Sequence, residues 1–389
     1  MQARENQSIP DLRTDVLTGR QVIVASSRSG RPNARQQDPD LNTSEDPFLE
    51  GSENATLGEW LALREPGTSV DQPGWKVRVV PNLYPAAVPN TGTFRGTAER
   101  TDTTAGDSPN AIPDVPLAPP LSSLLPSVPV SGIHDVVIEC PDGMSRLVEL
   151  SVTDVFHVLQ AWQLRLRQLR QFQNIREVAI FRNEGFSAGA SLKHCHSQII
   201  ATEFSGQLAR ARQDRARQHL QQTGRELVQD WLSAELFEAR RVLYSDSHFT
   251  VLCPFASRTS WQIRIVPMTP MQILFDDIGE VATRRLAELL RASLQAVEHV
   301  VGRFSFNLAV TLPPQHEAPL FRWMIDLLPR TSRIAGWEML TDVDMISVAP
   351  EDAAAQLREP LAGFLRNGEL TQSDHSASNL QWTSGADHS

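Results

Sequence analysis

The chain has 389 residues, of which 41% are hydrophobic and 21% charged, a composition that provides enough apolar material for a globular core. At about 150 residues per domain, this length predicts two or three domains. The 36 basic and 46 acidic side chains give a formal net charge of −10, which argues against a general binder of nucleic acid or anionic membranes. Three cysteines are too few for a disulfide framework, and no apolar run is long enough for a leader or a membrane span. We therefore expect a cytoplasmic protein.

Short strands are predicted in the first part of the chain. Residues 21–24 alternate in polarity and precede a Ser-Gly-Arg-Pro turn, and residues 77–81 and 134–140 are further strand candidates. Between these two candidates, residues 88–130 contain eight prolines among Thr, Ser, Gly and Asp. Such a segment cannot bury enough apolar surface to offset its ordering entropy, so we expect an insertion that is a long loop or disordered, either a lid or a spacer.

The middle of the chain predicts a helix between strands. Residues 151–172 carry apolar side chains at helical spacing behind a Ser/Thr/Asp start signal. Residues 177–182 and 198–202 are predicted as strands that flank a glycine-containing turn, and residues 204–241 as a polar, mostly helical stretch with a solvated charged face.

The second half repeats this order of elements. Strands are predicted in HFTVLCPF and WQIRIVPM, a helix over 281–301, and strands in FSFNLAVTL and FRWMIDLLP. A strand–strand–helix–strand–strand unit that occurs twice indicates an internal duplication. Residues from 368 onward are polar, which predicts a frayed tail.

The segment FRNEGFSAGASLKHCHSQIIAT, residues 181–202, carries the most informative side chains. His194, His196 and Gln198 occupy alternate positions, so on a strand they face one way. Cys195 would point to the opposite side and is expected to be a small buried hydrophobe. Upstream residues could bring the backbone close to a ligand and supply N–H and hydroxyl donors, namely Asn183, Gly185, Gly189 and Ser191.

Three interpretations of the two histidines compete. As metal ligands they form an incomplete set, because no Cys-x-x-Cys or His/Glu cluster lies nearby. They could also be structural histidines on a half-buried strand. In the third interpretation a neutral imidazole attacks phosphorus and forms a nucleotidyl-histidine, with the Gln amide and Ser hydroxyl stabilising charge on the phosphate oxygens. A His-x-His-x-Gln segment behind a glycine loop favours the third.

The collinear motifs of the chain resemble those of the galactose-1-phosphate uridylyltransferases of the histidine-triad superfamily. The resemblance covers residues 13–358 and rests on RTDVLTGRQVIVASSRSGRP, PNLYPA, HDVVIECPDG, the His-x-His-x-Gln segment, HFTVLCPFASR and LLPRTSRIAGWE. It implies an α+β fold of two tandem histidine-triad-like halves, each an antiparallel sheet with packed helices. The corresponding boundaries are residues 9–203 for the first half, which carries the catalytic motif, 204–366 for the second, and 367–389 for a polar tail.

The resemblance also implies a ping-pong reaction. A nucleotide sugar transfers its nucleoside monophosphate to His196 and releases a hexose 1-phosphate, and a phosphate-bearing acceptor then collects the nucleotidyl group. His194 would orient the nucleophile through its main-chain carbonyl. The remaining matched positions are Gln198 and Ser191 at the phosphates, Asn183 and Gly189 in the phosphate loop, Arg28 and Arg31 near the nucleotide phosphates, Asn82 at the nucleoside, and Glu338 at the sugar hydroxyls.

The sequence departs from the family at its metal sites. The usual zinc site uses Cys-Pro-Phe-Cys, a Pro-Asp-His turn and the first motif histidine, but this chain has Asp46-Pro47-Phe48-Leu49 and Pro141-Asp142-Gly143. Three of the four ligands are replaced, so we expect neither a tetrahedral zinc nor any other cofactor. The second family site aligns with Arg322-Trp323-Met324, which lacks its histidines.

A second departure follows Glu338, where the chain reads Thr341-Asp342-Val343-Asp344. Two carboxylates beside a hexose phosphate would repel it. Either this loop turns away, or the acceptor is not galactose 1-phosphate.

We expect a nucleotidyltransferase that moves UMP from UDP-glucose or a related nucleotide sugar to a hexose 1-phosphate, as in galactose metabolism. An alternative is an ADP-glucose phosphorylase-like enzyme that uses inorganic phosphate, and another is a non-catalytic nucleotide-sugar-binding relative. We expect no nucleic-acid or membrane partner, and the resemblance implies a homodimer.

Overall fold

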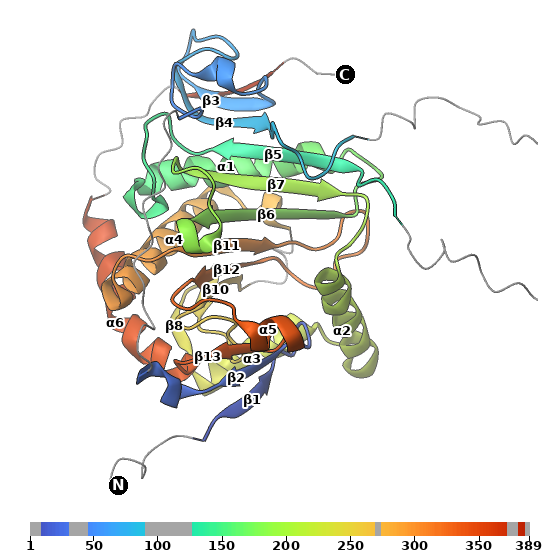
Figure 1. Ribbon diagram of the computed structural model, residues 1–389, viewed down its shortest axis with the longest axis vertical. Coiled ribbons are helices and arrows are strands. Elements are labelled where there is room, and N and C mark those ends of the chain that lie inside the picture. Colours follow the sequence, from blue (N-terminus) through green and yellow to red (C-terminus); the bar gives the residue numbers. More distant parts are fainter. Residues whose placement is uncertain (1–8, 31–45, 90–126, 269–273, 372–379, 386–389) are drawn as a thin grey trace, which may run out of the picture.

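The computed structural model describes residues 9–30, 46–89, 127–268, 274–371 and 380–385. Within these ranges an 11-stranded sheet forms the centre of the molecule, in the order β14-β3-β4-β5-β7-β6-β11-β12-β10-β9-β8, and its neighbouring strands are antiparallel (Figure 1). The strand bounds are β3 Leu61–Arg64, β4 Trp75–Pro81, β5 Gly132–Ile138, β6 Glu177–Glu184, β7 His196–Thr202, β8 Val242–Ser245, β9 Phe249–Leu252, β10 Ile263–Pro267, β11 Phe306–Thr311, β12 Met324–Pro329 and β14 Gln381–Ser384.

The order of the strands confirms the internal repeat. The first half contributes β3-β4-β5-β7-β6 and the second β8-β9-β10-β12-β11, so each half exchanges its last two strands in the same way. One helix lies between the third and fourth strands of each unit, α1 (Val152–Leu169) and α4 (Glu280–Val301). The halves join where β6 pairs with β11. The fold is therefore the expected α+β arrangement of two tandem histidine-triad-like units, fused through one sheet.

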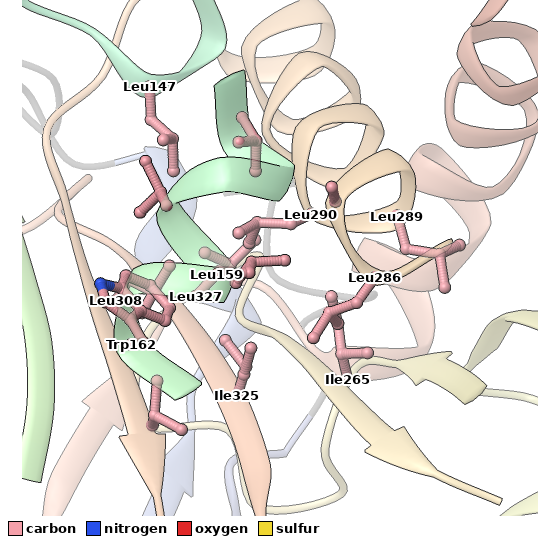
Figure 2. Packing of buried hydrophobic residues seen from close by; sticks show 14 of the residues in the cluster. Leu147, Leu159, Trp162, Ile265, Leu286, Leu289, Leu290, Leu308, Ile325 and Leu327 are labelled. Atoms are coloured by element: carbon pink, nitrogen blue, oxygen red, sulfur yellow. The ribbon is translucent and has the colours of Figure 1, made fainter. Parts of the chain in front are cut away.

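The two helices share a single core on one side of the sheet. Helix α1 begins at a capping box, in which the Ser151 hydroxyl accepts from the Asp154 N–H at 3.1 Å and the Asp154 carboxylate accepts from the Ser151 N–H at 3.1 Å. Its apolar stripe meets side chains of α4 and of the second-half strands (Figure 2). Fully burying such a side chain stabilises the fold by about 1.5–3 kcal/mol, so this core holds both halves together.

A smaller sheet joins the two ends of the repeat. It consists of β1 (Asp11–Thr14), β2 (Gln21–Val24) and β13 (Asp344–Ile346), with β13 parallel to β2. The start of the predicted first half therefore lies against the end of the second, although the division at residue 203 does fall between β7 and α2. The remaining helices are α2 (Gln207–Thr223), α3 (Leu227–Glu238), α5 (Gly336–Thr341) and α6 (Pro350–Thr371), and a 3₁₀ turn, η1 (Ser26–Gly30), follows β2.

The expectation of a frayed tail from residue 368 was wrong in part. Helix α6 continues to Thr371, and β14 pairs with β3 at the edge of the large sheet, with Gln381 opposite Arg64. An edge strand presents unpaired N–H and C=O groups, and β14 supplies their partners. Most of the proline-rich insertion, residues 90–126, lies outside the described residues. No helix within the described ranges is both long and apolar enough to span a lipid bilayer.

Candidate active site

The two motif histidines and Gln198 lie on the face of the sheet opposite the helical core. Cys195 is fully buried in that core, as the alternation predicted. The Phe48 ring contacts both histidines edge-on, with ring centroids 6.0 Å from His194 and 5.4 Å from His196. The loop that begins at Asp46 therefore covers the histidine face.

The ring of His196 is held in one tautomer and is neutral. Its Nδ1 lies 2.8 Å from the carbonyl oxygen of His194, and because a carbonyl only accepts, Nδ1 carries the proton and Nε2 the lone pair. Among the described residues, no hydrogen bond engages Nε2. Burial lowers the pKa of His196 to about 4, and the nearby Arg182 charge acts in the same direction. The imidazole is therefore unprotonated at neutral pH.

A buried ion cluster supports the strand under His196. Arg182 on β6 donates to the His196 carbonyl at 3.3 Å and to Glu184 at 2.8 Å, and it contacts Glu139. Glu184 also accepts from the Leu147 N–H at 2.8 Å. The cluster fixes the backbone of β7 at His196. Its only sequence signal is the presence of charged residues in otherwise apolar strands.

Gln198 is oriented by a residue that the sequence analysis did not select, His134 on β5. The Ala86 N–H donates to His134 Nδ1 at 3.0 Å, so the proton of the ring lies on Nε2, which donates to Gln198 Oε1 at 2.9 Å. The amide nitrogen of Asn82 lies 3.1 Å from the same Nε2. The structure thus brings the predicted nucleoside residue Asn82 to Gln198. A lone histidine in the strand HDVVIEC was the available signal.

The predicted phosphate loop lies between β6 and β7 and is tied to the second half. Gly185 and Gly189 have φ of +85° and +82°, a conformation that side chains rarely adopt. The Asn183 amide oxygen accepts from Asn307 on β11 at 2.7 Å, and the same Asn307 nitrogen donates to the Ala188 carbonyl at 2.9 Å. Ser191 is exposed. Asn307 was not predicted, although it is the one amide in FSFNLAVTL.

Arg28 and Glu338 lie in another part of the structure. Arg28 is exposed on η1, and the Glu338 carboxylate caps its own helix by accepting from the Ala335 N–H at 3.1 Å. Both belong to the region around the small sheet, and Figure 1 shows α5 well apart from β7. Arg31 lies outside the described residues. The structure thus gathers the histidine, glutamine and asparagine positions and leaves these two apart.

The acidic loop after Glu338 is neutralised. Arg20 pairs with Asp342 at 3.0 Å and with Asp344 at 3.2 Å, and Arg258 lies 3.3 Å from Asp344. Asp344 is buried within β13. These carboxylates are thus paired with arginines at the small sheet.

The positions that correspond to the family zinc ligands still converge, but their chemistry has changed. Asp46 Oδ2 lies 2.8 Å from His194 Nδ1, and His194 Nε2 lies 2.9 Å from the Cys140 carbonyl. The Leu49 side chain lies against Gly143, 3.6 Å from where a Cβ would stand. The described residues hold no group of three or more His, Cys, Asp or Glu side chains suited to a metal ion. This donor set does not fit a tetrahedral metal.

The second family metal position is likewise occupied by other chemistry. Arg322 is fully buried, donates to Glu226 at 2.5 Å, and reaches the Pro267 and Met268 carbonyls at 3.1 and 3.0 Å. A paired arginine fills this position.

Comparisons with known proteins agree with this geometry. Residues 82–205 match the family model for the galactose-1-phosphate uridyl transferase N-terminal domain. The chain is 29% identical to an ADP-glucose phosphorylase of Arabidopsis thaliana over 363 residues, 91% of this chain and 94% of that protein. It is 25% identical to the galactose-1-phosphate uridylyltransferase of Thermotoga maritima, over 59% of this chain and 74% of that protein.

Solved structures give the same result. An ADP-glucose phosphorylase from Arabidopsis thaliana, crystallised with bound ADP-glucose, superposes with a TM-score of 0.69 at 26% identity, covering 90% of this chain and 99% of that one. A uridylyltransferase at 20% identity and a TM-score of 0.64 shares the fold. The chain is therefore similar, in sequence and in fold, to an ADP-glucose phosphorylase and to galactose-1-phosphate uridylyltransferases.

Proposed function

We propose that this protein transfers a nucleoside monophosphate from a nucleotide sugar to a phosphate-bearing acceptor through a covalent His196 intermediate. The lone pair of Nε2 attacks the α-phosphorus, a P–N bond forms, and the P–O bond to the β-phosphate breaks as hexose 1-phosphate leaves with the electron pair. An acceptor phosphate oxygen then attacks the same phosphorus, and the P–N bond breaks with its electrons returning to the imidazole. Both steps rely on positioning and charge stabilisation.

One observation carries this proposal, the 2.8 Å hydrogen bond from His196 Nδ1 to the His194 carbonyl. It fixes the tautomer in which Nε2 is the nucleophile, while burial keeps the ring neutral. Gln198, held by His134, supplies an amide N–H near this nitrogen for a developing oxyanion. A merely structural histidine would not need an unengaged ring nitrogen.

We favour ADP-glucose as the donor and inorganic phosphate as the acceptor, with ADP and glucose 1-phosphate as products. The similarity to the Arabidopsis ADP-glucose phosphorylase extends over nine tenths of both chains, whereas the Thermotoga uridylyltransferase matches 59% of this chain. The second candidate function is UMP transfer from UDP-glucose to a hexose 1-phosphate. Neutralisation of Asp342 and Asp344 by Arg20 and Arg258 removes the electrostatic objection to it.

We also propose that the reaction proceeds without a metal at the His194 position. Asp46 takes the place of a metal ligand and pairs with the histidine directly. The contact of Leu49 with Gly143 fills the space beside it.

The deciding experiment is intact-mass measurement of the protein mixed with ADP-glucose or UDP-glucose in the absence of acceptor, with His196→Ala as control. An AMP adduct on the wild type alone, discharged to ADP by inorganic phosphate, is the expected result. A UMP adduct that only galactose 1-phosphate discharges would select the second candidate. Binding of both sugars with no adduct would overturn the transferase and leave a nucleotide-sugar-binding protein.

A further inference from the structure

A row of polar side chains crosses the seam between the two halves beside the nucleophile. Asn307 on β11 is paired with Asn183 on β6, so the two side chains share a face. Continuing the β6–β7 register by two residues from Phe181 and Gln198 sets Asn183 beside His196. Arg330, which follows β12, donates from Nε to the Asn307 amide oxygen. The row therefore runs from His196 through two asparagines to an arginine.

Among the described residues Arg330 makes no ion pair within 4.0 Å, and the carboxylate that acts on its charge, Asp344, is already paired with Arg20 and Arg258. The only side-chain hydrogen bond of Arg330 there goes to a neutral amide. Burial lowers the pKa of this half-buried guanidinium and the nearby Arg258 charge acts in the same direction, while the Asp344 carboxylate opposes them without reversing the shift. By contrast, the arginines of the described residues that are less than 9% exposed each pair with a carboxylate, namely Arg64, Arg78, Arg165, Arg182, Arg241, Arg264 and Arg322. An unpaired, partly desolvated charge is costly, and a bound anion would offset that cost.

We infer that Arg330 is a phosphate-binding residue contributed by the second half, specific for the phosphate that carries the sugar or belongs to the acceptor. This inference rests on the proposed function. Strands lie about 4.8 Å apart, so two strand spacings separate His196 from the Arg330–Asn307 contact, roughly 10 Å. The α-phosphate is next to His196, and the β-phosphate of a nucleotide sugar extends from it toward Arg330. A guanidinium fork matches such a group.

The hydrogen bonds of the row orient the guanidinium group of Arg330. Arg330 uses Nε on Asn307, which leaves its two terminal nitrogens as donors. The amide N–H groups of Asn307 donate to the Asn183 amide oxygen and to the Ala188 carbonyl of the phosphate loop. The Asn183 oxygen is thereby satisfied, and its own NH₂ group remains to donate to the phosphate. Because ping-pong transfer places leaving and accepting phosphates in one position, Arg330 serves both half-reactions.

The inference is tested by comparing ligands that differ by one phosphate. In a His196→Ala background, which prevents turnover, calorimetry measures the affinity of the full chain for AMP and for ADP-glucose. Arg330→Gln should weaken ADP-glucose binding by about tenfold or more and change AMP binding by less than about twofold. In protein that retains His196, Arg330→Gln should also raise the concentration of inorganic phosphate needed to discharge the adduct. For both measurements, Arg330→Lys should give values between those of Arg330 and Arg330→Gln.

Arg291→Gln is the matched control, because Arg291 is also half-buried, has no carboxylate partner among the described residues and lies on α4, on the other face of the sheet. It should alter neither affinity. Equal losses for AMP and ADP-glucose in Arg330→Gln, or no loss for either, would overturn the inference. Failure of the wild type to form an adduct would refute the proposed function and leave this binding comparison intact.

Discussion

Asp46 and His194, 148 positions apart in the chain, lie 2.8 Å from each other beside the nucleophile. The other ring nitrogen of His194 faces the Cys140 carbonyl, and the His194 carbonyl holds His196 Nδ1. Both ring nitrogens of His194 thus face an acceptor oxygen. The side chain of Asp46 thus fixes the backbone group that sets the tautomer of the nucleophile.

Asp46→Asn should slow adduct formation by about tenfold or more, because a hydrogen bond to a charged group stabilises by about 1.5–3 kcal/mol. Nucleotide-sugar affinity should stay close to wild type, since Asp46 acts through His194. Single-turnover mass measurements and calorimetry check the two quantities. Asp352→Asn, a change of an exposed carboxylate on α6, is the control. An unchanged adduct rate would show that the pair is dispensable.

Prolonged chelation should leave the adduct rate and the thermal midpoint of the wild-type protein unchanged. The donor set at His194 does not fit a tetrahedral metal, and on the proposal made above the Asp46–His194 contact positions the histidine. Elemental analysis of the purified protein accompanies the chelation series. Loss of activity together with a stoichiometric metal would contradict the metal-independent proposal.

The pH dependence of adduct formation should follow the lowered pKa of His196. The neutral ring persists down to about pH 4, so the acid limb due to this group should lie near that value and not near 6.5. The same shift makes stability depend on pH. Between about pH 4 and pH 6.5 the unfolded chain binds a proton at this histidine that the folded chain does not. The free energy of unfolding therefore decreases as pH falls from about 6.5. A pH series of single-turnover rates tests this, and a limb centred near 6.5 would show that the ring is solvated.

His134→Ala should slow adduct formation, because His134 orients the Gln198 amide. The proper test is a double-mutant cycle with Gln198→Ala. Once Gln198 is absent, removal of His134 should have almost no further effect on the rate, a coupling of about 1 kcal/mol or more. Additive losses would mean that the two side chains act independently.

Gly189→Ala should destabilise the protein by about 1–2 kcal/mol, because its φ of +82° is left-handed. No atom lies within 4 Å of the added methyl, so the cost is one of backbone conformation. Gly363→Ala also adds a methyl into open space, but inside helix α6, where it should stabilise by about 0.5–1 kcal/mol. Denaturant unfolding of both variants gives the comparison. Similar changes in the free energy of unfolding for the two variants would show that the left-handed backbone conformation of Gly189 does not cause the loss.

Much of the site could be predicted from local sequence pattern. The alternation of His194, His196 and Gln198 fixes their common face, since side chains alternate along any strand. The same rule placed Cys195 in the core, where it is fully buried. The repeated order of strands and helix likewise predicted the two matching halves.

The partners of these residues could not be predicted in this way. His134 and Gln198 are 64 positions apart, and Asn183 and Asn307 are 124 apart. Nothing in a local pattern states which distant side chain will meet another. For the same reason, the sequence indicated repulsion from Asp342 and Asp344 and gave no sign of the arginine that neutralises them.

The sequence by itself therefore predicted most elements of the repeat and the common face of His194, His196 and Gln198, because strand alternation, helix capping and turn chemistry act over a few neighbouring residues. Only the tertiary structure decided how the nucleophile is held. The loop that contains Asp46 packs against His194, sheet register brings Asn307 to Asn183, and burial lowers the pKa of His196. Such distances and local dielectric arise only when the whole chain has packed.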